Sequence, residues 1–466
     1  MSRPATLGEL RSSGWVSRPV KEEMRRNAIA RLRSGEPLVA GVVGYEDTVI
    51  PQLANAILAG HDVVFLGERG QAKTRIIRSM IELLDEYLPI VAGSEINDDP
   101  FHPISAHARH LIADRGDETP IEWVHRSRRF GEKLATPDTS IADLIGEVDP
   151  IKVAEGRYLS DELTIHYGLV PRTNRGIFAI NELPDLAERI QVGLLNVLEE
   201  RDVQIRGYKV QLPVDVMLFA SANPEDYTNR GRIITPLKDR FGAQIRTHYP
   251  LDTEIEVAVI AQEATTPTTD GLQVRVPDFM IDIVAEISQL ARRSPHVNQR
   301  SGVSARMSIT NYETLVANAT RRAFANDESE AVPRISDLDA LVASSAGKVE
   351  IETLDDGREE QVLDRIIKAA VLETFRARVR PEHLGPLVQA FESGLQINTG
   401  EDVPSIDYAN ALAKLEGFSG VLDDLGVGES PAAVASAVEF VLEGMHLTKR
   451  LNKDAVGGRA TYRGRG

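Results

Sequence analysis

The sequence predicts an α/β fold built on a parallel, doubly wound sheet, followed by helical regions. Three apolar runs indicate strands of that sheet: VVFL at 63–66, GIFAI at 176–180 and VMLFASA at 216–222. Short runs rich in β-branched and aromatic residues are typical of strands that are covered on both faces. Between and after these runs, apolar residues recur every three or four positions, which predicts the helices.

The first strand leads directly into a glycine loop that ends in Lys73-Thr74. Backbone N–H groups of such a loop wrap the phosphates of a nucleoside triphosphate, and its lysine reaches the β and γ oxygens. The threonine hydroxyl is a ligand for Mg²⁺. We therefore expect ATP to contact a continuous set of residues: Gly67, Glu68, Arg69, Gly70, Gln71, Ala72, Lys73 and Thr74.

Ala72 departs from the usual form of this loop. It occupies the position before the lysine, where a second glycine is expected. An alanine carries a Cβ that disfavours positive φ, whereas glycine tolerates it. We therefore expect Ala72 to adopt a negative φ.

Polar residues follow the other two strands. Asn181-Glu182 ends the strand at 176–180, and Asn223 follows the strand at 216–222. In P-loop ATPases the end of the corresponding strand holds the magnesium shell and polarises the attacking water. A polar side chain at the end of the third strand is placed to touch the γ-phosphate or that water. The order of these motifs predicts an ATP site with Mg²⁺ near Thr74, Asn181 and Glu182.

Together these motifs resemble AAA+ ATPases of the branch that contains the MoxR proteins and the small ATPase subunit of magnesium chelatase. The loop ending in AKT has the MoxR-like form, whereas ASANPED at 220–226 and DRFG at 239–242 resemble magnesium chelatase. LNVLEERDVQIRGYKVQLP at 195–213 resembles the family's helix and hairpin ahead of the third strand. The resemblance implies a P-loop AAA+ αβα sandwich with a parallel sheet and a helical lid.

The resemblance also implies roles for single residues. Glu182 would be the catalytic carboxylate that orients water, and Asn223 would be sensor 1. Val43 and Gly44, in the segment GVVGY, would lie beside adenine.

Two arginines complete the implied site. Arg240 would be an arginine finger that acts on the neighbouring subunit's nucleotide, and Arg306 would be the sensor 2 residue at a helix start in the lid. The alternative for Arg240 is a surface residue at a helix end. For Arg306 it is a capping or salt-bridging residue.

Asn181 is a departure from the family, which has Asp-Glu where this chain has Asn-Glu. An amide oxygen can still accept a hydrogen bond from metal-bound water, but it lacks the charge. We expect weaker metal affinity or slower turnover. Two alternatives remain: another acid such as Asp185 serves, or the chain is a nucleotide-binding subunit with little hydrolysis.

The sequence suggests five segments. Residues 1–37 form an N-terminal helical extension, 38–250 the nucleotide-binding domain and 251–345 the helical lid. Residues 362–450 form a further C-terminal helical region, and 451–466 a flexible Gly/Arg tail. Within the second segment, a long stretch from Gly93 to Asn174 is expected to be largely irregular, which is usually a mark of a functional or mobile segment.

Composition excludes several classes of protein. The chain has 466 residues, a formal net charge of −17 and no cysteine. The acidic balance argues against general nucleic-acid binding, and the basic run Arg126, Arg128 and Arg129 is interpreted as a solvated face or partner contact. Without cysteine there are no disulfides or thiolate metal sites. We expect a cytoplasmic protein, since neither a signal peptide nor a membrane-spanning run is apparent.

Three functions are compatible with these observations. The resemblance favours a MoxR-like, chaperone-type ATPase ring, most often a hexamer, that remodels a client with a partner carrying a von Willebrand factor A domain. The second is the motor subunit of a magnesium chelatase. The third and weakest is an enhancer-binding transcription activator, since the sequence lacks the GAFTGA loop of that family. The sequence does not identify the client.

Overall fold

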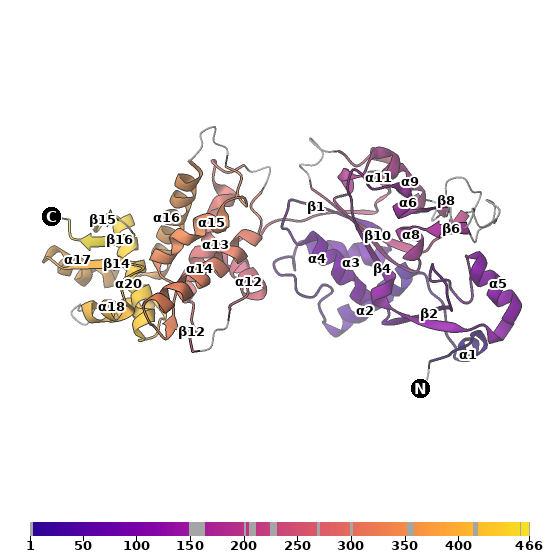
Figure 1. Cartoon of the computed structure of the whole chain (residues 1–466), viewed down its shortest axis with the longest axis horizontal. Helices are drawn as coiled ribbons and strands as arrows, with labels where there is room; N and C mark the ends of the chain where they lie inside the picture. The colour runs from indigo at the N-terminus through magenta and orange to yellow at the C-terminus, as the bar shows by residue number, and fades with distance from the viewer. Residues whose placement is uncertain are drawn as a thin grey trace. The chain divides into compact units, whose positions relative to one another are not determined.

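The computed structural model describes residues 3–148, 164–199, 202–204, 211–223, 231–267, 271–298, 302–351, 358–412, 418–456 and 458–465. The chain divides into two compact units (Figure 1). Unit 1 is Met1–His248, and unit 2 is Tyr249–Gly466.

A five-stranded parallel sheet forms the centre of unit 1. Its strands are β11 (Ala243–Arg246), β1 (Val63–Leu66), β10 (Val216–Ala222), β7 (Gly176–Asn181) and β4 (Phe130–Leu134), in that order. Every neighbouring pair is parallel. This confirms the predicted α/β fold with a parallel sheet.

Helices cover both faces of this sheet (Figure 1). Alternate residues of β1 point to opposite sides: Val63 and Phe65 join one buried cluster, and Val64 joins the other. The first cluster includes α2 (Val20–Ser34), α3 (Val49–Ala59) and α4 (Lys73–Ser79). The second includes α9 (Glu188–Glu199) and α11 (Thr235–Arg240). The sheet is therefore the middle layer of an αβα sandwich.

The stretch from residue 93 to 174 is more regular than expected. It contributes β4, an edge strand of the central sheet, and β3 (Ile121–His125), which pairs antiparallel with β2 (Tyr87–Val91). β4 was not predicted from its sequence, FGEKL, because charged residues on a half-buried edge strand break the apolar pattern. The other elements of unit 1 are α1 (Leu7–Ser12), α5 (Ala106–Arg115), α6 (Ile141–Leu144), β5 (Gly146–Val148), β6 (Ile165–Tyr167), α8 (Leu169–Arg172), β8 (Asp202–Gln204) and β9 (Gln211–Pro213).

The first residues of the chain are hydrogen-bonded to the stretch from residue 93 to 174. The Leu7 N–H donates to the Thr119 carbonyl (2.9 Å), and the Ile121 N–H donates to the Ala5 carbonyl (2.8 Å). The N-terminal extension is thus part of unit 1. The turn of the expected hairpin, Arg206-Gly207-Tyr208, and the PED residues of ASANPED lie outside the described residues.

Unit 2 joins the expected lid and the C-terminal helical region around one core. Phe279 of α13 stacks on Phe440 of α20 with ring centroids 4.5 Å apart. A single buried cluster extends from Ile260 to Tyr462. The helices of unit 2 are α12 (Thr253–Glu263), α13 (Asp278–Arg293), α14 (Arg306–Ala325), α15 (Leu341–Ser345), α16 (Arg358–Arg378), α17 (Gly385–Glu392), α18 (Ser405–Leu412), α19 (Phe418–Leu425) and α20 (Pro431–Leu447).

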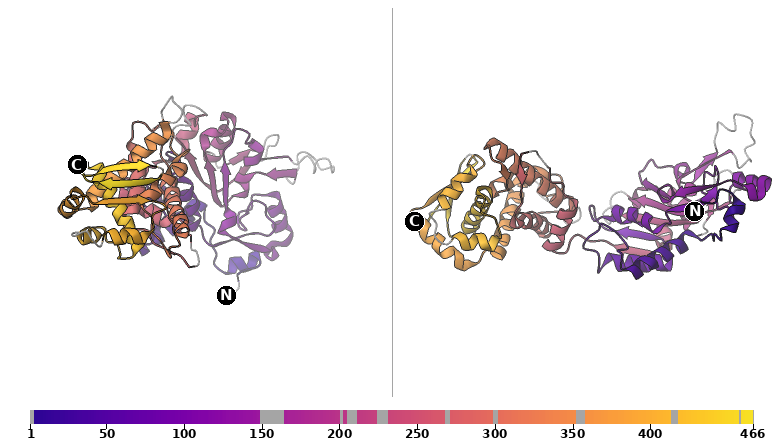
Figure 2. Two further views of the ribbon diagram at one scale, coloured as in Figure 1. Left: turned by 60° about the vertical axis from the view of Figure 1, so that its left-hand side comes forward. Right: turned by 90° about the horizontal axis from the view of Figure 1, so that it is seen from below.

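The expected flexible tail is instead part of a sheet. The antiparallel strands β14 (Gln396–Gly400), β16 (Arg459–Arg463) and β15 (Asn452–Val456) lie side by side near the C-terminus (Figure 2). Buried Tyr462 donates a hydrogen bond to Glu443 of α20, and Lys453 pairs with the same carboxylate at 2.7 Å. These contacts anchor the tail. A further short pair is β12 (Gln273–Val274) with β13 (Glu330–Ala331).

A buried ion pair lies at the start of two central strands. Arg129 precedes β4 and is fully buried; its Nη1 and Nη2 donate to Glu23 of α2 at 2.9 and 2.6 Å. Its Nε donates to the carbonyl of Arg175, which precedes β7, at 2.8 Å. The interpretation of the basic run as a solvated face is therefore wrong for Arg129, which is buried and paired. Its partner lies 106 positions away in sequence, so no local pattern indicated the pair.

Replacing Glu23 by alanine should destabilise unit 1 strongly, because it leaves the Arg129 charge buried without its partner. We expect the free energy of unfolding to fall by about 3–5 kcal/mol, measured by urea unfolding. Glu22→Ala is the matched control, since Glu22 is exposed on the same helix and should cost less than about 0.5 kcal/mol. Equal losses for the two variants would contradict the role of the pair.

Candidate functional site

The carboxyl ends of three central strands meet at one edge of the sheet. Leu66 of β1 is aligned with Ala222 of β10, and Ala220 is aligned with Ile180 of β7. The residues that follow these strands therefore come together: the phosphate loop after β1, Glu182 after β7 and Asn223 after β10. Ligands of open parallel sheets bind at this edge.

The phosphate loop is folded around its own lysine. Lys73 begins α4 and is buried, and its ammonium donates hydrogen bonds to the carbonyls of Gly67 and Glu68. Thr247 closes the loop from the other side, because its hydroxyl donates to Gln71 Oε1 at 2.7 Å. A Cβ at Gly67 would lie 1.9 Å from the Thr247 hydroxyl, so only glycine fits there. The cation is thus held inside the loop.

Ala72 adopts a conformation opposite to the expected one. Its φ is 53° and its ψ is 12°, in the left-handed region. The expectation of a negative φ is therefore wrong. The loop must reverse direction before α4, and this geometry is imposed although the Cβ disfavours it by about 1–2 kcal/mol.

Asn181 is the centre of a hydrogen-bond network at the end of β7. Its Oδ1 accepts from the hydroxyls of Thr74 (3.2 Å) and Ser221 (3.1 Å). Its Nδ2 donates to Glu132 Oε1 of β4 at 2.6 Å. Thr74 and Asn181, predicted as metal ligands, are therefore adjacent.

Glu182 follows with a positive φ of 55°, and its N–H donates to the Ser221 hydroxyl at 3.3 Å. Hydroxyl, amide and carboxylate oxygens are the ligands that Mg²⁺ prefers. Thr74, Asn181 and Glu182 therefore fit a magnesium site, although the described residues contain no cluster of three or more histidines, aspartates or glutamates able to hold a metal.

The remaining predicted residues occupy separate positions. Asn223 is buried directly after β10, and Arg240 ends α11 with its guanidinium 3.0 Å from Asp239. Val43 and Gly44 are half-buried in the loop before α3. Arg306 is the exposed first residue of α14, in unit 2.

Tyr45, adjacent to Val43 and Gly44, connects this loop to the phosphate loop. Its hydroxyl lies 3.0 Å from the Gln71 carbonyl and 2.6 Å from the His248 carbonyl. Its ring meets the His248 imidazole edge to face, with centroids 4.8 Å apart. Burial raises the pKa of Tyr45, so the hydroxyl stays protonated. These contacts connect the loop before α3 to the phosphate loop, which is distant in sequence.

Sequence reasoning missed four residues of this site: Glu132, Ser221, Thr247 and Tyr45. Ser221 was within the recognised strand, and the only signal was a hydroxyl in an otherwise apolar, buried run. Glu132 lies on β4 and Thr247 directly follows β11, two strands that sequence motifs did not identify. Their partners are distant along the chain, so no local pattern pointed to them.

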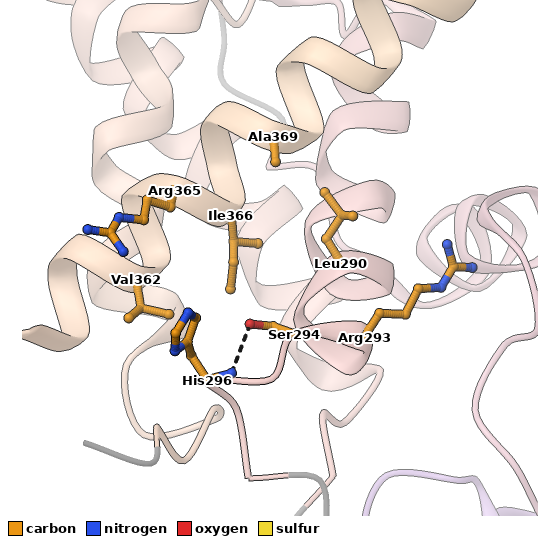
Figure 3. A pocket seen from close by; sticks show the side chains of 8 residues that line it. All are labelled: Leu290, Arg293, Ser294, His296, Val362, Arg365, Ile366 and Ala369. Atoms are coloured by element: carbon orange, nitrogen blue, oxygen red, sulfur yellow. Dashed lines mark hydrogen bonds between the residues drawn. The ribbon is translucent and has the colours of Figure 1, made fainter. Parts of the chain in front are cut away.

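A separate pocket of about 250 Å³ lies between α13 and α16 in unit 2 (Figure 3). Its wall is apolar, with Leu290 and Ile366 facing the hollow, while the guanidinium groups of Arg293 and Arg365 point away from them. This wall provides neither a phosphate cradle nor a carboxylate. The edge of the central sheet is therefore the candidate site.

No helix in the described part of the chain is long and apolar enough to cross a membrane.

Comparison with known proteins points the same way. The chain is 26% identical over 290 residues to magnesium-chelatase subunit ChlI-1 of Arabidopsis thaliana, covering 56% of this chain and 65% of that protein. It is 28% identical over 232 residues to subunit ChlI of Nostoc sp., covering 48% and 57%. The profile of the sigma-54 interaction domain matches residues 155–240. These similarities support the AAA+ branch.

The AAA+ similarity has a limited extent. The chain spans less than two thirds of the length of these curated relatives. Among solved structures, the complex between BchI and BchD of magnesium chelatase is 20% identical and covers 69% of this chain and 98% of that chain, with a TM-score of 0.37. NtrX from Brucella abortus is 15% identical and covers 74% and 66%, with a TM-score of 0.38.

Replacing Ala72 by glycine should stabilise the phosphate loop. Glycine removes the Cβ penalty of the left-handed conformation but adds unfolded-state entropy, so we expect a net gain of about 0.5–1 kcal/mol in unfolding free energy. ATP affinity should be retained.

The matched control is Ala317→Gly, at an exposed position inside α14, which should cost about 1 kcal/mol. Urea unfolding measures both variants. A loss of stability in Ala72→Gly comparable with that of the control would show that the conformation at 72 carries no strain.

Proposed function

We propose that this chain is a MoxR-like AAA+ ATPase that binds and hydrolyses ATP with Mg²⁺ in a ring, most often a hexamer, to remodel or assemble a client protein complex. The observation that carries the proposal is the meeting of the phosphate loop, Asn181-Glu182 and Asn223 at one edge of a parallel sheet. The curated relatives are named as subunits of magnesium chelatase, which supports the proposal that this chain acts together with another protein. For this chain a partner with a von Willebrand factor A domain is the expected one.

Each residue has a role in this proposal. Lys73, already held inside the loop, contacts the β/γ-phosphates and offsets their charge. Thr74, Asn181 and Glu182 would hold Mg²⁺, which when bound neutralises charge that develops on the phosphates. Glu182 orients the attacking water. Asn223, buried directly after β10, contacts the γ-phosphate or that water.

The ring is proposed from Arg240 and Arg306. Arg240 is at the C-terminal end of α11 with a side chain that is 38% exposed, as contact with a neighbouring copy requires. It would stabilise charge on the nucleotide of that copy. Arg306, exposed at the start of α14, would act as sensor 2.

A second candidate is the motor subunit of a metal chelatase. Its support is the sequence similarity to ChlI subunits of plants and cyanobacteria. In that case the same ATP cycle would act on a separate metal-inserting subunit. An enhancer-binding activator is weaker: the sigma-54 profile matches part of the chain, but its GAFTGA loop is absent from the sequence.

The ATP site is tested by two substitutions. Lys73→Ala should weaken ATP binding at least tenfold, because it removes a charge-assisted contact with the phosphates. Glu182→Gln should bind ATP normally but lower kcat by about 10²–10⁴-fold, since it cannot activate water. Equilibrium binding and steady-state hydrolysis measure these, with Lys368→Ala on the surface of unit 2 as control. Unchanged ATP affinity in Lys73→Ala would refute the site.

The ring is tested by mixing variants. Arg240→Ala should bind ATP but not hydrolyse it, because the finger acts on the neighbouring copy. Mixing it with Lys73→Ala should restore part of the activity, since a Lys73→Ala copy supplies Arg240 to an intact site. Hydrolysis of the wild type should also rise more than linearly with protein concentration. No restoration at any mixing ratio would favour a structural role for Arg240.

A further inference from the structure

Asn181 has a defined amide orientation, and Glu132 sets it. A carboxylate only accepts hydrogen bonds, so the Asn181 Nδ2 must face Glu132 Oε1, 2.6 Å away. The amide oxygen then necessarily faces the opposite side, toward the hydroxyls of Thr74 and Ser221. The oxygen that would serve the metal shell is thus directed by a residue on a neighbouring strand.

Glu132 is itself held in place. Arg78 donates to it through Nε (2.7 Å, to Oε2) and Nη2 (3.0 Å, to Oε1). Arg78 lies one helical turn after Thr74 in α4, the helix that begins at the phosphate loop. The network therefore runs from the loop helix through Arg78 and Glu132 to Asn181, and returns to Thr74.

The strand register explains why this contact forms. Glu132 of β4 is aligned with Ala179 of β7, so both point to the same face of the sheet. Ala179 belongs to the cluster that includes α4, and Asn181, two residues on, points to that face as well. Glu132 is thus placed between Asn181 and Arg78 by the sheet itself.

We propose that Glu132 is a positioning residue of the ATP–Mg²⁺ site, which directs the Asn181 oxygen toward Thr74 and supplies from β4 the negative charge that position 181 lacks. This rests on the proposed ATP site. The carboxylate lies on the neighbouring strand, and the amide conveys its effect to the metal shell. Arg78 keeps this carboxylate in place.

An aspartate at position 181 would restore the Asp-Glu pair of the family, but it would not improve this site. An aspartate there, with Glu132 unchanged, would bring two carboxylates within about 3 Å of each other, and like charges at that distance repel. Asn181→Asp alone should therefore harm the site. Exchanging both groups, in Asn181→Asp/Glu132→Gln, keeps the total charge and allows the same hydrogen bond with donor and acceptor reversed.

The test measures the Mg²⁺ concentration needed for half-maximal binding of a fluorescent ATP analogue, with the thermal unfolding midpoint as a second readout. Glu132→Gln and Asn181→Asp should each raise the required Mg²⁺ about tenfold. The double variant should return to within about threefold of the wild type. Glu122→Gln, at an exposed position on β3, is the control and should match the wild type.

The outcomes separate the possibilities. A Mg²⁺ requirement unchanged by Glu132→Gln, or a double variant no better than the single ones, would overturn the proposal. A purely structural contact would lower the unfolding midpoint without moving the Mg²⁺ requirement, and this result would overturn it too. A wild type that binds no Mg²⁺–nucleotide would instead refute the proposed function.

Discussion

The register between β4 and β7 is the constraint on which the site depends. Arg129, immediately before β4, donates to the carbonyl of Arg175, immediately before β7, and is neutralised by Glu23 of α2. The two strands therefore start within one residue of each other, with Phe130 aligned to Ile177. A slip of one residue would turn Glu132 to the other face of the sheet, away from α4. A buried ion pair at one edge of the sheet thus determines which charges meet at the opposite edge.

The parts of the fold that sequence could predict are those with strong local patterns. The apolar strands β1, β7 and β10 have no charged residues and run into polar or glycine residues, so their type and their order along the chain were evident. The helices α12, α13 and α14 likewise lie in the segment 251–345, which was expected to be helical. Thr74 and Asn181, both predicted site residues, are in contact. They meet because the carboxyl ends of parallel strands lie at the same edge of the sheet.

What escaped prediction depends on distant partners. β4 has two charged residues, and only the neighbouring β7 makes it a strand. Arg129 belongs to a basic run that looks solvated until Glu23 is placed beside it. The C-terminal segment, rich in arginine and glycine, is ordered because Tyr462 and Lys453 both contact Glu443. In each case the deciding contact spans at least ten residues of sequence, beyond the reach of a local motif.

Backbone strain is also present at the site. Among the non-glycine residues that the structure describes with positive φ, Ala72 and Glu182 both flank the Thr74–Asn181 contact. Each sits where the chain leaves a strand or enters a helix and must turn sharply. Such conformations persist only where surrounding contacts over-determine them, here the loop around Lys73 and the hydrogen bond from Glu182 to Ser221. The sequence rule for Ala72 failed because these contacts outweigh a penalty of about 1–2 kcal/mol.

The shared core of unit 2 has a mechanical consequence. α13, in the expected lid, packs along α16, and Phe279 stacks on Phe440 in α20. Protein interiors are close-packed and transmit displacement, because their side chains interdigitate. A displacement of α12–α14 would therefore carry the C-terminal helices and the β14–β16 sheet with it. The helices expected to form the lid and the helical region after residue 345 are therefore parts of one hydrophobic core, so neither can shift without the other.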